Sequence, residues 1–186
     1  NLQTIAPASS IGAVRSLESK NPVIFSLKNG RILFFQGILL IIATLFVYWQ
    51  VGGHDFIGFD DDIYVYQNPH VMNGLSLDNI KWALLSTDAA NWHPLTWISH
   101  MTDVELYGLN PGKHHLTSVM IHAVSAVILM LLLWKMTNRV WQSMLVAALF
   151  ALHPAHVESV AWVAERKDTL SALFCFLTLL AYAQYV

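Results

Sequence analysis

The sequence predicts an all-α membrane protein with about four transmembrane helices and a long extracytoplasmic first loop. Three observations support this fold class. Of the 186 residues, 55% are hydrophobic and 12% are charged, whereas about a quarter of an average soluble domain is charged. The mean hydropathy is +0.49. Long uncharged runs also recur along the chain, and the run 32–51 can cross the roughly 30 Å hydrocarbon core of a bilayer as a helix.

The apolar runs define a membrane domain over residues 32–186, after an N-terminal tail over residues 1–31. We expect four helices, at about 32–51, 116–134, 139–152 and 169–186. The third is short, so it either extends through Arg139 and His153 into the interfaces or crosses the membrane where it is thinned. The fourth runs to the last residue without a polar flank, and we therefore expect the chain to be part of a longer protein.

Basic residues indicate how the spans are oriented. They precede the first span and occupy the short connection between the second and third spans: Arg15, Lys20, Lys28, Arg31, Lys135 and Arg139. Because basic residues favour the cytoplasmic side, both regions are predicted to be cytoplasmic. Segments 52–115 and 153–168 then lie outside, and they hold every acidic residue except Glu18. The net charge of -2 provides no basic surface for nucleic acid.

The long outer loop contains signals of a folded surface layer. The stretch Leu77 to Leu85 has helical apolar spacing, which suits a short helix in the membrane interface. We assign Trp92, Trp97 and Tyr107 to the aromatic belt of that interface. His122 lies within the second span, where it serves either a function or a hydrogen bond between helices.

Near its start the loop carries three consecutive acids, Asp60, Asp61 and Asp62. A solvated acidic loop is the simplest interpretation of such a triplet. Here, however, Phe59 and the apolar residues after Asp62 hold the carboxylates close to the bilayer, where an unpaired cluster is costly. Mutual repulsion raises the pKa of at least one member unless a cation is present. The pattern therefore favours a general base or a metal ligand.

The second outer segment carries another group of polar side chains. Pro154 suits the first turn of a helix with His153 at its cap, and Glu158, Trp162 and Glu165 then share one face, with Asp168 one turn further. The remaining polar residues are His156, Arg166 and Lys167. Together these groups can bind an anionic headgroup and a metal ion, or only each other. We expect this segment to lie close to Asp60 or Asp61, with Arg166 and Lys167 as their partners.

Four stretches of the chain resemble one known family. They are FDDDIYVYQNPHV, NWHPLTWISHM, YGLNPGKHHLTSVMIH and ALFALHPAHVESVAWVAERKDTLSALF. In this order they are similar to the N-terminal membrane part of the transmembrane and tetratricopeptide-repeat (TMTC-like) family. The resemblance implies a partial glycosyltransferase-C fold related to protein O-mannosyltransferases. It also implies an integral protein of a bacterial inner membrane with a cytoplasmic N-terminus.

The resemblance implies a reaction and roles for the outer residues. The donor would be a sugar linked to polyprenyl phosphate, and the acceptor a protein hydroxyl on the extracytoplasmic side. Asp60, with Asp61 beside it, would accept the hydroxyl proton. The donor or its headgroup would bind to residues of the second segment: His153, His156, Glu158, Glu165, Arg166, Lys167 and Asp168. A divalent metal ion is a further candidate, with Asp60 and Glu158 as its ligands, and no other cofactor is predicted.

The chain also departs from the family pattern. Members have further spans that complete the donor groove and a domain of tetratricopeptide repeats, and neither is found in these residues. We therefore expect catalysis only when those parts are present. The alternative function is a non-catalytic transmembrane subunit that packs within a larger membrane complex. Its partners would be membrane lipids and partner subunits in place of a lipid-linked sugar and a protein acceptor.

Overall fold

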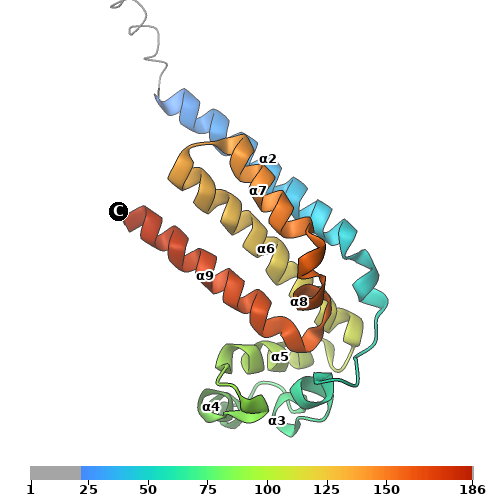
Figure 1. The fold of residues 1–186 in the computed structure, drawn as a ribbon. Coiled ribbons are helices and arrows are strands. Elements are labelled where there is room, and N and C mark those ends of the chain that lie inside the picture. The colour runs from blue at the N-terminus through green and yellow to red at the C-terminus, as the bar shows by residue number, and fades with distance from the viewer. Residues whose placement is uncertain (1–21, 186) are drawn as a thin grey trace, which may run out of the picture.

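The computed structural model describes residues 22–185, and its regular structure is entirely helical in that range. The predicted all-α class is therefore confirmed. Figure 1 shows four apolar helices gathered above a layer of shorter ones: α2 (Pro22–Val47), α6 (Pro111–Thr137), α7 (Val140–Leu152) and α9 (Arg166–Tyr185). The predicted tail falls largely outside the described residues, which begin at Pro22, where α2 starts.

Length and composition identify which helices can cross a membrane. The stretch Asn29–Val47 of α2 and the whole of α6 qualify. A third span results if α7 and the following stretch Pro154–Ala161, which are bent by 50° at their break, cross together. The helix α9 is continuous and lies at the predicted place of the fourth span. It does not qualify as a span, and charged residues fill its first turn. The described residues thus supply two or three spans, fewer than the predicted four.

The ends of α2 and α6 differ from the predicted boundaries, and at the start of α6 a local cap sets the difference. The helix α2 stops at Val47, and a 3-10 turn, Trp49–Gly53, replaces its predicted last residues. The helix α6 starts at Pro111, ahead of the predicted start at Leu116. There the side chain of Asn110 accepts a hydrogen bond from the Lys113 amide at 3.2 Å. An N-cap acceptor followed by proline is a favourable helix start.

Small side chains bring α2, α6 and α7 together. Ala126 of α6 is fully buried with Ala147 and Ala151 of α7, and these alanines pack with Leu33 and Leu40 of α2. Small residues let membrane helices approach closely and gain van der Waals contact. In Figure 1 these three helices run side by side, whereas α9 packs on α6 near the outer layer and diverges from it toward Tyr185.

His122 links α6 to α7. Its Nε2 lies 3.1 Å from the carbonyl oxygen of Ala151, within hydrogen-bond distance, and its side chain is buried. This contact matches the helix-to-helix hydrogen bond that was one of the two roles considered for His122.

The outer loop folds into a layer of short helices beneath the bundle (Figure 1). They are α3 (Pro69–Met72), α4 (Leu77–Leu85) and α5 (Pro94–Tyr107), with a π-helical turn at Asp62–Tyr66 and a 3-10 turn at Asp88–Ala90. The predicted helix over Leu77 to Leu85 is confirmed as α4. The hydroxyl of Ser76 caps it by accepting a hydrogen bond from the Asn79 amide at 3.1 Å.

The layer has its own core, which corrects one assignment. Trp97 and Met101 lie one turn apart on α5 and are both fully buried. The Trp97 ring stacks on that of Tyr64, with centroids 4.9 Å apart. Trp97 is therefore a core residue of the loop, and its assignment to the aromatic belt was wrong. Trp92 and Tyr107 remain exposed, at 67% and 43%, so the belt stays a prediction for these two.

A buried ion pair joins the outer layer to the bundle. The guanidinium of Arg166, at the start of α9, is 2.5 Å from the carboxylate of Asp103 on α5, and both side chains are buried. Arg166 also donates to the carbonyl of His114 at 2.6 Å and to the hydroxyl of Ser118 at 3.2 Å, both on α6. A fourth contact reaches the hydroxyl of Ser99 at 3.2 Å. One side chain therefore ties α5, α6 and α9 together.

We predict that Asp103→Leu destabilises the protein by about 3 to 5 kcal/mol, because it leaves the buried charge of Arg166 without its counterion. The measurement is the thermal unfolding midpoint in detergent. Asp88→Leu, at an exposed acid of the same loop, is the control and should change little. The double variant Asp103→Leu, Arg166→Met should recover most of the loss, since it removes both charges. A single variant as stable as wild type would contradict this role of the pair.

We predict that the outer layer and the α6–α7 turn lie on opposite sides of the membrane. The only cysteine, Cys175, is exposed, so it is first replaced by alanine. A cysteine at Asn73 should then react with an impermeant reagent only from outside, and one at Thr137 only from the cytoplasm. Labelling of the Asn73 cysteine from the cytoplasm alone would reverse the topology.

Candidate functional site

Asp60 is presented by a tight turn. Its φ is 67°, in the left-handed region, and the amide of Asp61 donates across it to the carbonyl of Phe59 at 3.0 Å. A hydrogen bond between residues i and i+2 defines a γ-turn. The Asp60 carbonyl then accepts from the Tyr64 amide at 2.9 Å, which starts the following helical turn. Unfavourable backbone conformations concentrate at functional sites, and this one leaves Asp60 partly exposed.

Asp61, by contrast, is completely buried and holds the two outer segments together. One carboxylate oxygen accepts from the Ile57 amide at 2.8 Å, and the other accepts from the Ala164 amide at 2.9 Å. Burial raises the pKa of Asp61, while these two hydrogen bonds act in the opposite direction. The predicted proximity of the acidic pair to the second segment is thus confirmed. The predicted partners were wrong for Asp61, because backbone amides take the place of Arg166 and Lys167.

The second segment is broken where Asp61 binds it. It consists of a 3-10 turn, Pro154–His156, then α8 (Val157–Ala161), another 3-10 turn, Val163–Glu165, and the start of α9. Trp162 is extended, with φ -97° and ψ 123°. The Ala164 amide, which would donate to a carbonyl one turn earlier in a continuous helix, donates to Asp61 instead. The predicted single helical face of Glu158, Trp162 and Glu165 is therefore wrong.

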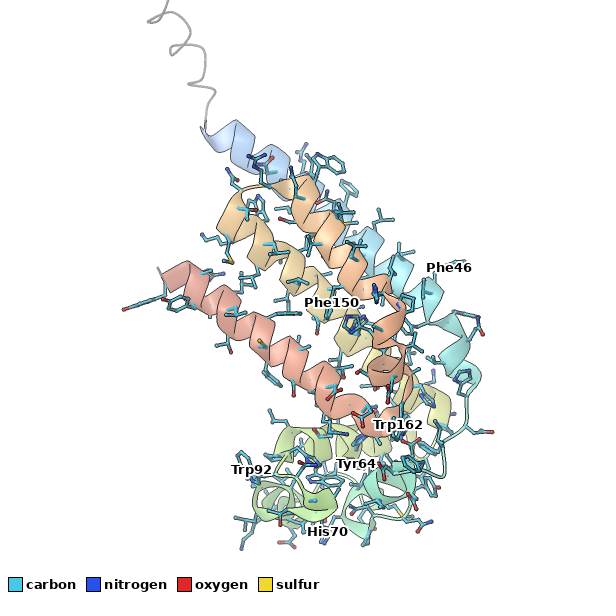
Figure 2. All side chains as sticks on the ribbon, in the orientation of Figure 1. Phe46, Tyr64, His70, Trp92, Phe150 and Trp162 are labelled. Carbon is cyan, nitrogen blue, oxygen red and sulfur yellow. The ribbon has the colours of Figure 1, made fainter. Side chains whose placement is uncertain are left out.

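Trp162 strengthens the same junction. Its indole N–H donates to the carbonyl of Phe59 at 3.2 Å, and the two aromatic rings lie 5.7 Å apart. Figure 2 shows Trp162 and Tyr64 on the two sides of this junction, close to the start of α9.

A second group of charges surrounds Tyr64. The ammonium of Lys167 is 2.7 Å from the carboxylate of Glu165 and lies 5.4 Å from the centre of the Tyr64 ring. Burial raises the pKa of the Tyr64 hydroxyl, the charge of Lys167 lowers it, and the charges of Asp60 and Glu165 raise it. Glu165 and Lys167 therefore lie together at the Tyr64 ring, and the backbone of Asp60 is joined to that of Tyr64 by a hydrogen bond of 2.9 Å.

The other predicted residues lie apart from this group or have other roles. Arg166 is buried in the ion pair with Asp103, and its guanidinium is taken up by contacts within the protein. Glu158 is exposed. His153 caps its own turn by accepting from the Ala155 amide at 3.1 Å, as the sequence predicted.

His156 and Asp168 face the bundle at a different place. They line a small cavity of about 220 Å³ beside His122, and the two imidazole rings are 5.6 Å apart. Asp168 also accepts from the hydroxyl of Ser159 at 3.1 Å. The predicted site residues are thus not gathered in one place: Glu165 and Lys167 lie at Tyr64, whereas His156 and Asp168 line this cavity.

The donor set does not favour a metal ion. Within residues 22–185, no three His, Cys, Asp or Glu side chains are placed together so that they could hold one. The candidate ligands Asp60 and Glu158 are therefore not part of such a group.

Four important residues were not predicted from the sequence: Tyr64, His93, His100 and Asp103. His93 stacks on Tyr64 with centroids 5.4 Å apart, and His100 is fully buried in the same cluster. Burial lowers the pKa of both histidines, as does the charge of Lys167. The sequence did contain a signal for two of these residues. In the largely apolar stretch LTWISHMTDV, His100 and Asp103 lie on one face of a helix.

Comparison with known proteins identifies the family. Over 139 residues the chain is 32% identical to protein O-mannosyl-transferase TMTC1 of Mus musculus, an alignment that covers 67% of the chain and 14% of that relative. The chain belongs to the TMTC-like family. It is also 28% identical over 148 residues to protein O-mannosyl-transferase Tmtc2 of Drosophila melanogaster, with 75% of the chain and 16% of the relative covered.

Protein O-mannosyl-transferase TMTC3 of Mus musculus is 28% identical over 158 residues, which cover 81% of this TMTC-like chain. The chain thus spans about one sixth of the length of these relatives. No family model and no solved structure matches it significantly. The glycosyltransferase-C fold therefore stays a prediction.

We predict that Asp61→Ala loosens the junction without unfolding the bundle. Each buried amide that loses its acceptor costs about 1 to 3 kcal/mol. Hydrogen exchange at the Ile57 and Ala164 amides should therefore accelerate about 10- to 100-fold. Asp62→Ala is the control, because its side chain makes no hydrogen bond within the described residues. Unchanged exchange at Ala164 in the Asp61 variant would contradict the junction.

Proposed function

We propose that this chain is part of a membrane glycosyltransferase of the protein O-mannosyltransferase type. In this proposal a sugar passes from a polyprenyl-phosphate carrier to a protein hydroxyl on the extracytoplasmic side. The names of the relatives support the reaction type, and the basic residues of the α6–α7 connection support the orientation. The observation that carries the proposal is the different burial of two adjacent acids: Asp61 is buried, whereas Asp60 is partly exposed.

Asp60 is the proposed general base. Asp61 is buried and occupied by two backbone amides, so it is not free to accept a proton from a substrate. Asp60 is partly exposed, and its backbone is fixed by the γ-turn before it and the helical turn after it. Fixing a base in place reduces the entropy that must be lost to reach the transition state. Asp61 therefore acts as the positioning residue for Asp60.

The proposed step is a displacement at the anomeric carbon of the donor sugar. The acceptor oxygen attacks the anomeric carbon, its proton passes to Asp60, and the bond from that carbon to the phosphate oxygen breaks. The anomeric carbon is inverted, and the polyprenyl phosphate leaves with the added negative charge. Lys167 is the proposed cation for that charge, because it is partly exposed and lies beside Tyr64, where the phosphate would compete with Glu165 for its ammonium. Arg166 is not assigned this role, since its guanidinium is taken up by contacts inside the protein.

We predict that Asp60→Asn lowers sugar transfer by about 100- to 10,000-fold, the range typical of losing a general base. The measurement is transfer of labelled sugar from a polyprenyl-phosphate donor by the full-length protein, in membranes that lack the native gene. Asp62→Asn is the matched control in the same triplet and should retain most of the activity. Expression and thermal stability should match wild type in both variants.

Two results would argue against the proposal in different ways. Near-normal transfer by Asp60→Asn would remove the base role from Asp60 while leaving the reaction in place. No dependence on a lipid-linked sugar by the wild-type protein would instead favour the non-catalytic subunit.

A further inference from the structure

A large groove lies between the end of α2 and the start of α6, and Tyr64 does not line it. It has a volume of about 1000 Å³ and lies between the outer end of α2, the turn Trp49–Gly53 and the first turns of α6. Its residues belong to neither the Tyr64 group nor the His122 cavity. Ligand pockets of small molecules have volumes of about 300 to 1,000 Å³, so the groove is large enough for a substantial part of a lipid.

The lining changes from apolar to polar along the groove. At the membrane end it consists of apolar side chains from the two spanning helices, including Leu45, Val119 and Met120. At the outer end it contains Gln50, Asn110 and Lys113. Lys113 and Met120 are about 10 Å apart along α6, from the rise of 1.5 Å per residue. This is the arrangement that an amphiphile needs, with its chain in the bilayer and its head at the surface.

Glycines let the turn Trp49–Gly53 approach the start of α6 closely at the outer end of the groove. Gly52, Gly53 and Gly112 line it, and the backbones of Gly52 and Gly112 are in direct contact, so that a side chain at Gly112 would collide with the Gly52 carbonyl. A Cβ atom at Gly53 would meet nothing within 4 Å. The turn Trp49–Gly53 and the start of α6 therefore meet with no side chain between them.

The charge of the groove differs from that of its surroundings. The outer segments hold all the acidic residues except Glu18, yet none of them lines the groove, where Lys113 is the permanently charged side chain. Lys113 is exposed and has no ion-pair partner within residues 22–185. A cation at the surface end of an apolar groove attracts an anionic headgroup.

We propose that this groove binds one anionic phospholipid. Its phosphate lies at Lys113, and an acyl chain lies between Leu45 and Met120 on the lipid-exposed side of α2 and α6. Met120 is 41% exposed, so the chain can enter directly from the bilayer. The proposal does not depend on sugar transfer, because no residue assigned to the reaction lines the groove.

The test is native mass spectrometry of the purified full-length protein, with phosphatidylglycerol or phosphatidylcholine added in turn. Wild type should retain one phosphatidylglycerol molecule and prefer it to phosphatidylcholine. Lys113→Gln should weaken phosphatidylglycerol binding about fivefold, the effect of removing one surface cation, with little effect on phosphatidylcholine. Met120→Trp should fill the apolar end and weaken both lipids. Lys81→Gln, at an exposed lysine on α4, is the control and should bind like wild type.

Three results would overturn the proposal. Equal binding of the two lipids by wild type would remove the role of charge. Full retention of phosphatidylglycerol by both groove variants would place the lipid elsewhere. Displacement of phosphatidylglycerol by polyprenyl phosphate at equal concentration would make the groove part of a donor site instead. Unfolding midpoints equal to wild type in all variants ensure that lost binding is not lost structure.

Discussion

The buried guanidinium of Arg166 is the constraint on which the outer half of the protein depends. A charge removed from water is tolerated only when it is paired and its donors are used, and Asp103, His114, Ser118 and Ser99 meet that need from α5 and α6. Because these contacts must form together, they fix where α9 starts relative to the outer layer. The long loop is thereby held against the bundle although it contains few long helices.

The position of α9 determines the different roles of Asp60 and Asp61. With Arg166 fixed, the residues just before it turn out of helical geometry, and the free amide of Ala164 points to Asp61. Asp61 then has a structural role, the γ-turn fixes the backbone of Asp60 one turn before Tyr64, and Lys167 lies over the Tyr64 ring. Two chemically identical neighbours therefore differ in role because one is buried against backbone donors and the other is not. The assignment of base and positioning residue follows from that difference.

Much of the fold could be predicted from the sequence, whereas the features that the sequence analysis missed depend on long-range contacts. Composition and uncharged runs were enough for the helical class, and the apolar spacing of Leu77 to Leu85 was enough for α4. Helical periodicity failed at Trp162, because the acceptor that interrupts the helix, Asp61, lies 103 positions away. The sequence analysis also placed Arg166 among the ligand-binding groups, because no local pattern reveals its buried counterion, Asp103 on α5. Trp97 was misplaced for the same reason, because its stacking partner Tyr64 lies in another segment.

The most direct test of the account is a structure of the full-length protein in a bilayer with a non-transferable polyprenyl-phosphate sugar bound. The account predicts that the anomeric carbon faces the carboxylate of Asp60, that the phosphate lies at Lys167, and that Asp61 remains bonded to the Ala164 amide. A sugar bound at the cavity between His122 and His156, or an Asp61 carboxylate released from Ala164 to face the sugar, would contradict it.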